Sequence, residues 1–216
     1  MIVPESPEPF LVEFLPAFVA EIGGASGGAS ALGRGSDAAP RSRRAPSGAG
    51  VAVRVVGAGE WTLRLSDGAL VVSLGVAGDV ALQISLRAED FTRLVVEPIR
   101  TALQASDDGT NARALAARSF WTRLGRFDDE TAELLRRQEG RILVRIDDGG
   151  NARHIALTPG LIEHSLDRAE CCIDCEITAL EAVQARRKNP LDLFYEGQIR
   201  ITGDAQIALA MAGLFL

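Results

Sequence analysis

The sequence lacks the features that most simply identify an enzyme or a membrane-spanning protein. No apolar run approaches the roughly 20 residues of a transmembrane helix. Only two histidines are present, and neither lies in a nucleophile motif. The P-loop and Gly-x-Gly-x-x-Gly patterns of nucleotide-binding proteins are missing as well. We therefore expect a protein that is not an enzyme, with no catalytic residue and no cofactor.

Basic residues are also fewer than acidic residues. The chain has 29 acidic and 23 basic residues, a formal net charge of −6, whereas nucleic-acid binding depends on neutralising phosphates. We expect no nucleic-acid partner. The first residues are acidic and lack the basic start of a secretion signal, which favours a cytoplasmic protein. With 47% hydrophobic residues in 216, the chain can form one large or two small globular domains.

The three cysteines, Cys171, Cys172 and Cys175, lie close together, with His154 and His164 nearby. Such a cluster invites a metal site. The surrounding residues nevertheless alternate between apolar and polar, as in a strand, where Cys171 and Cys175 would share a face about 13 Å apart. Cys172 would point to the other face, so no pair could bind one zinc ion at about 2.3 Å. We expect core and surface thiols and no metal.

Composition separates two N-terminal segments. Residues 1–22 carry phenylalanines at steps of four from Phe10, the spacing of an amphipathic helix, which Pro16 should kink. This helix either packs on the domain or touches a membrane as a lid. Residues 23–50 are rich in Gly, Ala and Ser and nearly devoid of large apolar residues. They predict a disordered linker, because they cannot bury enough surface to offset chain entropy.

The rest of the chain contains two β-meanders. Residues 51–105 and residues 141–216 each contain alternating strands between glycine-containing turns, and residues 106–140 predict connecting helices. Segments 80–94 and 172–186 both run from a strand into a helix, so the two meanders look like imperfect copies. We expect an α+β fold with a mainly antiparallel sheet covered by helices, arranged as an imperfect tandem of two such units; one enlarged sheet is the alternative.

The end of the chain shows a specific order of motifs. Asn189-Pro190 is followed by Phe194, by the run EGQIRITGD at 196–204, and by a helix rich in Ala, Leu and Met that Asp204 can cap. The preceding run 169–187 supplies a strand and a helix. In order and spacing, this stretch resembles the C-terminal part of the sterol carrier protein 2 (SCP-2) family. The resemblance implies a sterol-carrier-like α+β fold, a tunnel for a lipid, and binding and transfer rather than catalysis.

The resemblance and the apolar surplus of the last strand and helix suggest which residues line such a tunnel, because a tunnel needs apolar walls and few polar anchors. The candidate lipid-binding residues are Leu193, Phe194, Ile199, Ile201, Ile207, Met211 and Leu214. Each would equally suit an ordinary core. Ala208 and Ala212 leave room on the same helix, so a larger side chain at either position should block the ligand.

Two functions remain open. The first is binding or transfer of a hydrophobic small molecule or lipid, namely a sterol, a fatty-acyl compound or an isoprenoid. The second is an accessory or scaffold role supporting a lipophilic biosynthetic pathway, for which a membrane surface or partner enzymes would be the further contacts.

Overall fold

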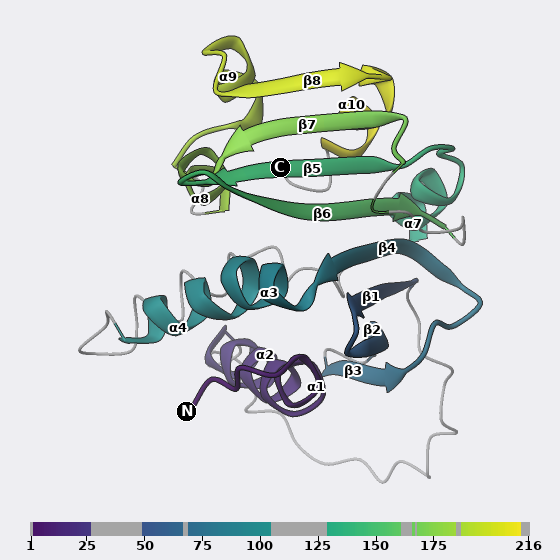
Figure 1. The fold of residues 1–216 in the computed structure, drawn as a ribbon. Coiled ribbons are helices and arrows are strands. Elements are labelled where there is room, and N and C mark those ends of the chain that lie inside the picture. Colours follow the sequence, from purple (N-terminus) through teal and green to yellow (C-terminus); the bar gives the residue numbers. More distant parts are fainter. Residues whose placement is uncertain are drawn as a thin grey trace, which may run out of the picture.

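The computed structural model describes residues 2–26, 49–66, 69–104, 129–160, 166, 168–184 and 187–212. Its strands form one eight-stranded sheet in the order β3-β2-β1-β4-β6-β5-β7-β8 (Figure 1). Neighbouring strands are antiparallel except for the parallel pairs β1–β4 and β5–β7. The predicted α+β class with a mainly antiparallel sheet is confirmed.

The sheet consists of two halves with related connectivity. The first half contains β1 (Gly50–Val56), β2 (Gly59–Ser66), β3 (Ala69–Leu74) and β4 (Val80–Arg87). The second contains β5 (Ile142–Asp148), β6 (Asn151–Pro159), β7 (Cys171–Glu176) and β8 (Ile199–Gly203). In each half, the first strand of a hairpin also pairs in parallel with a strand that enters a helix. β4 and β6 join the halves, so the strands form one enlarged sheet; a tandem origin stays a prediction.

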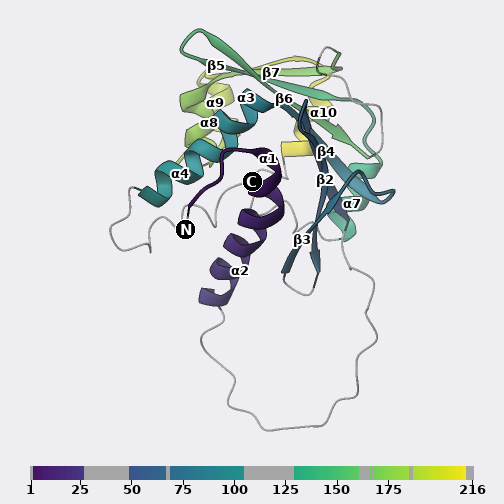
Figure 2. The same cartoon turned by 60° about the horizontal axis from the view of Figure 1, so that its bottom comes forward.

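Most helices gather on the inner side of the curved sheet (Figure 2). Beside the first half lie α1 (Pro7–Pro9), the π-helix η1 (Phe10–Phe14), α2 (Leu15–Ser26), α3 (Ala88–Phe91), the π-helix η2 (Thr92–Val96) and α4 (Glu97–Gln104). Helix α7 (Asp129–Arg136) precedes β5. Beside the second half lie α8 (Ile177–Gln184), α9 (Pro190–Tyr195) and α10 (Ala205–Ala212). Within the described part of the chain, no helix combines the length and apolar character needed to cross a membrane.

A π-helical turn lets the helical path that begins at Ala88 continue past Pro98. Proline lacks an N–H and crowds the carbonyl four residues earlier. In η2 the Glu97 N–H bonds instead to the carbonyl of Thr92, five residues back, and this wider turn accommodates the proline. The helical path therefore continues to Gln104. η1 stands in the same relation to the proline at the start of α2.

The N-terminal helical segment packs into the core of the first half. Phe10 and Phe14 have ring centroids 5.2 Å apart, and Phe14 stacks on Phe18 at 5.4 Å. Phe10 also meets the edge of Phe91 in α3 at 5.5 Å. All four rings are buried, and the burial of each contributes on the order of 1.5–3 kcal/mol to the stability of the fold. Of the two alternatives for this segment, packing on the domain is therefore the one observed.

Several predictions concern segments that the structure does not describe. The predicted linker at 23–50 falls outside the described residues except at its ends, where α2 continues to Ser26 and β1 begins at Gly50. Most of the predicted connecting region at 106–140 falls outside them too. At its described end, α7 is present, and Glu133 pairs with Arg137 at 3.3 Å.

Candidate functional site

An apolar cavity of about 410 Å³ lies in the second half, between the inner face of the sheet and helices α8, α9 and α10. Binding sites for small molecules commonly measure about 300–1,000 Å³. The sheet side of the wall includes Val144 of β5, Ile173 and Cys175 of β7, and Ile199 and Ile201 of β8. The helix side includes Leu180 and Val183 of α8, Leu191, Phe194 and Tyr195 of α9, and Ala205, Ala208 and Leu209 of α10.

Strand register brings the sheet side of the wall together. Val144 lies opposite Ile173 in the parallel pair, and Ile173 lies opposite Ile201 in the next pair. Cys175 and Ile199 form a neighbouring row. Because alternate side chains of a strand point to the same face, these rows present a continuous apolar surface to the helices.

Helix α9 closes part of the cavity. This helix was not predicted from the sequence. The Asn189 side chain accepts the N–H of Leu191 at 2.8 Å, and Pro190 occupies the first helical position. Both are helix-starting features, so Asn-Pro begins α9 here as well as following the previous helix. The short helix carries Phe194 and Tyr195 to the cavity.

Helix α10 begins as the sequence predicted. The Asp204 carboxylate accepts the N–H of Gln206 at 2.9 Å. The helix then directs Ala208 to the cavity and Ile207 into the core, where an added Cβ at Gly140 would overlap the end of the Ile207 side chain. The small side chain at 208 leaves space that a larger one would fill.

Helix α8 begins at Ile177, directly after β7, so Thr178 lies in its first turn. The Thr178 hydroxyl group donates to the carboxylate of Glu176, at 3.4 Å. The helix turns Leu180 towards the cavity.

The structure divides the predicted lipid-binding residues into three groups. Phe194, Ile199 and Ile201 lie together in the cavity wall. Leu193 and Ile207 are buried in the protein interior but do not line the cavity. Met211 lies in α10 with its side chain outside the described part, and Leu214 lies outside the described residues altogether. Binding of lipid by any of them stays a prediction.

Comparison with known proteins bears directly on this half of the molecule. Residues 122–216 match the SCP-2 sterol transfer family. This match confirms the resemblance seen in the sequence. We call this segment the SCP-2 region; it spans α7 to α10 and contains every residue of the cavity wall.

Several solved structures are similar to the chain, and sterol carrier proteins are among them. Sterol carrier protein 2-like 2 of Aedes aegypti is 14% identical over 53% of this chain and 97% of its own, with a TM-score of 0.33. Sterol carrier protein 2 of Yarrowia lipolytica, in its apo form, is 14% identical over 52% of this chain and 94% of its own, with a TM-score of 0.34. No curated protein matches the sequence.

The cysteine strand of the SCP-2 region offers a protonated thiol to the cavity. Burial, with the nearby charge of Asp174, raises the pKa of Cys175 to about 11. Burial likewise raises the pKa of Cys171. Because thiolates are the forms that bind metals and attack electrophiles, Cys175 acts here as a small apolar wall residue. Among the described residues, no three His, Cys, Asp or Glu side chains cluster as metal ligands would.

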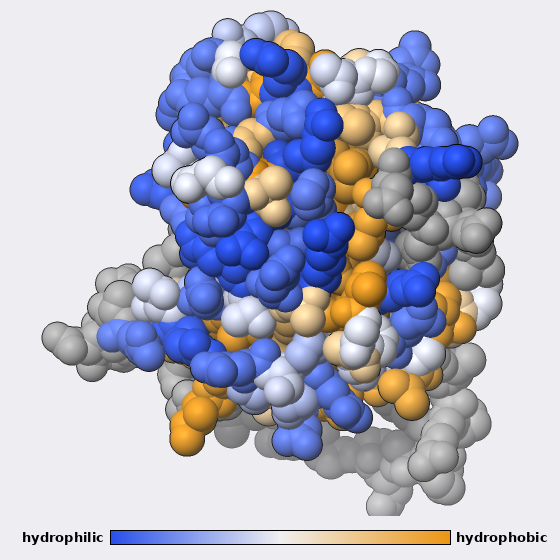
Figure 3. Space-filling view, in the orientation of Figure 1, coloured by the Kyte–Doolittle hydropathy of each residue, from blue (hydrophilic) through white to orange (hydrophobic). Residues whose placement is uncertain are grey.

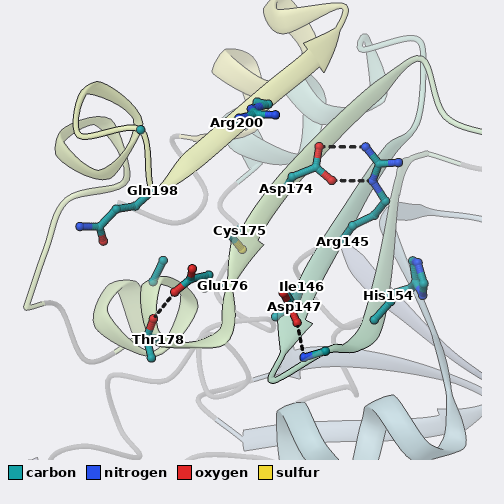
Figure 4. Close-up of a pocket in the computed structure, with 14 residues that line it drawn as sticks. Arg145, Ile146, Asp147, His154, Asp174, Cys175, Glu176, Thr178, Gln198 and Arg200 are labelled. Atoms are coloured by element: carbon teal, nitrogen blue, oxygen red, sulfur yellow. Dashed lines mark hydrogen bonds and ion pairs between the residues drawn. The ribbon is translucent and has the colours of Figure 1, made fainter.

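The outer face of the SCP-2 region carries a larger but shallow hollow of about 980 Å³ (Figure 4). It lies within a strongly polar surface (Figure 3). Several of its charged groups already have partners within the hollow: Asp174 accepts two bonds from Arg145, at 2.6 and 2.8 Å, and Asp147 accepts the N–H of Gly150 at 2.7 Å. This is a solvated charged face, so the smaller apolar cavity is the better candidate for a ligand site.

Proposed function

We propose that this protein binds a long-chain lipid in the apolar cavity of its SCP-2 region and carries it without chemical change. The observation that supports this most directly is an apolar cavity enclosed by β5, β7, β8 and three helices, all within the segment that matches the SCP-2 family. The wall holds a protonated thiol and no charged side chain, which favours an apolar ligand over a charged one.

Burial of the lipid chain would supply the affinity. Each methylene removed from water contributes about 0.8 kcal/mol, so a chain of about ten methylenes contributes roughly 8 kcal/mol before the costs of association are subtracted. An empty apolar cavity also leaves its wall with missing contacts, and a ligand restores them. Binding should therefore stabilise the protein as well as sequester the lipid.

Substitution of Ala208 by Phe tests the proposal. The ring would project from α10 into the cavity, because Ala208 is buried and lies in its wall. We expect Ala208→Phe to weaken binding of a fluorescent fatty acid at least tenfold, with circular dichroism as the folding control. Ala205→Phe, at a more exposed part of the wall, serves as a second variant if Ala208→Phe fails to fold.

Gln206→Phe is the matched control. It adds the same ring to the same helix, but Gln206 is exposed and does not line the cavity. We expect its affinity for the fluorescent fatty acid to equal that of the unmutated protein. Unchanged binding in a folded Ala208→Phe variant would place the ligand elsewhere. No binding by the unmutated protein would reject lipid binding and leave the accessory role.

A further inference from the structure

The mouth of the cavity is formed by apolar side chains that are themselves exposed to solvent. These mouth residues are Leu191, Phe194 and Tyr195 on α9, and Leu209 on α10. Each is an exposed large hydrophobic residue and also part of the cavity wall. The apolar surface of the cavity is therefore continuous with an apolar patch on the outside of the protein.

We propose that the mouth residues dock on the surface of a lipid bilayer, with the cavity opening towards it. This inference rests on the proposed function. When a lipid moves from a bilayer into water, each methylene that becomes exposed makes the transfer about fourfold less favourable. A mouth pressed into the bilayer removes that barrier, since the chain then passes from one apolar phase to another. Because the patch is continuous with the cavity, a lipid bilayer is the partner that best fits the patch.

The composition of the patch suits the interfacial zone of a bilayer. Phe194 and Tyr195 lie edge to face with ring centroids 5.8 Å apart. Tyrosine has an apolar ring and a polar hydroxyl, which together favour the boundary between lipid and water. Exposed leucines on either side add apolar area, on which interfacial binding depends.

Among the described residues beside the patch, positive and negative charges nearly cancel. Lys188 pairs with Glu196 at 2.5 Å, while the exposed Arg187 and Asp192 carry opposite signs. The docking surface is therefore close to neutral. It matches a zwitterionic lipid surface, and apolar insertion rather than attraction to anionic lipids should provide the binding.

The chain's longer amphipathic segment is not available for this role. Phe10, Phe14 and Phe18 lie in the core of the first half. The first half does expose other apolar side chains, including Leu74 on the edge strand β3, but they are not part of the cavity wall. Leu74 therefore provides a control for exposure alone.

Flotation with phosphatidylcholine vesicles tests the proposal in the full-length protein. The two variants to compare are Tyr195→Asp and Leu74→Asp, since the two side chains are 82% and 80% exposed, respectively. We expect Tyr195→Asp to lower the vesicle-bound fraction about tenfold or more, because it removes a large inserted ring and adds a charge. Leu74→Asp should bind vesicles as the unmutated protein does. Adding phosphatidylglycerol or salt should change little.

The outcomes separate this inference from the proposed function. Fluorescent fatty-acid binding in vesicle-free solution tests the cavity alone. If the unmutated protein binds the fatty acid but does not float, membrane docking is wrong while lipid binding stands. Docking through the mouth residues is also wrong if flotation requires phosphatidylglycerol. It is equally wrong if the vesicle-bound fraction falls to the same extent in both variants, or falls only in Leu74→Asp.

Discussion

Gly203 should be the most sensitive glycine at the edge of the cavity. It ends β8, opposite Cys171, with φ at +86°, a conformation in which a residue with a Cβ costs about 1–2 kcal/mol. A Cβ here would also overlap the carbonyl oxygen of Glu170 and lie 3.2 Å from its carbonyl carbon. That oxygen accepts the N–H of Asp204 at 2.9 Å, so the crowded atom is rigid backbone.

Gly75 isolates the conformational part of this cost. Its φ is +85°, but an added Cβ would have no neighbour within 4 Å. We expect Gly75→Ala to lower the free energy of unfolding by about 1–2 kcal/mol, the conformational penalty alone. Gly203→Ala should lower it by a further 1–3 kcal/mol or so, the usual cost of forcing atoms into a filled site.

Urea unfolding followed by circular dichroism measures the difference. With a dependence of about 2 kcal/mol per molar urea, the Gly203→Ala midpoint should lie roughly 0.5–1.5 M below that of Gly75→Ala. Because β8 also carries Ile199 and Ile201 to the cavity, Gly203→Ala should weaken fatty-acid binding while Gly75→Ala should not. Equal midpoints for the two variants would refute the clash with Glu170.

Two further predictions concern pH and metal. Hydrogen bonds from the side chain and then the backbone N–H of Arg141 lower the pKa of Glu170 to about 2, so Glu170 stabilises the fold above its ordinary pKa of 4.5 and loses that effect as pH falls towards 2. Because the Glu170 carboxylate is 45% exposed, it contributes at most about 1 kcal/mol to stability. In Glu170→Gln, the free energy of unfolding should therefore change less between pH 4.5 and pH 2 than in the unmutated protein. The same pH dependence in both proteins would contradict the assignment. A strong zinc chelator should leave the melting temperature unchanged, because Cys171 and Cys175 lie about 13 Å apart along β7; a lower melting temperature would show that these thiols hold metal.

Local sequence patterns were sufficient for most of the secondary structure. Two-residue alternation predicted the strands, and Asp204 marked the start of α10 because capping depends only on adjacent residues. Helix α9 was missed because six residues are too few to show helical periodicity, and Asn189-Pro190 resembles a stop as much as a start. The parallel pairing of β5 and β7 joins distant segments, which no local pattern reveals.

The cavity itself was harder to predict than the elements around it. Ile207 and Ala208 on the last helix are both buried. Which of them meets empty space depends on the partner across the interface, and Ile207 faces Gly140, whose missing side chain lets it pack into the core. Val144, Ile173 and Leu180 were missed for the same reason, since only the assembled sheet and helices show which apolar faces leave a gap.

The pairing of β4 with β6 ties the sheet of the SCP-2 region to the first half. A free strand edge displays unpaired N–H and C=O groups and invites association with other chains. Here residues Leu82 to Leu86 of β4 cover the edge of β6 from Ile155 to Pro159, so the first half caps the sheet of the SCP-2 region. Cutting the chain between the halves would uncover β6 along that stretch. We therefore expect the matched segment alone to aggregate more readily than the whole chain, because its β6 edge would be free to pair with other copies.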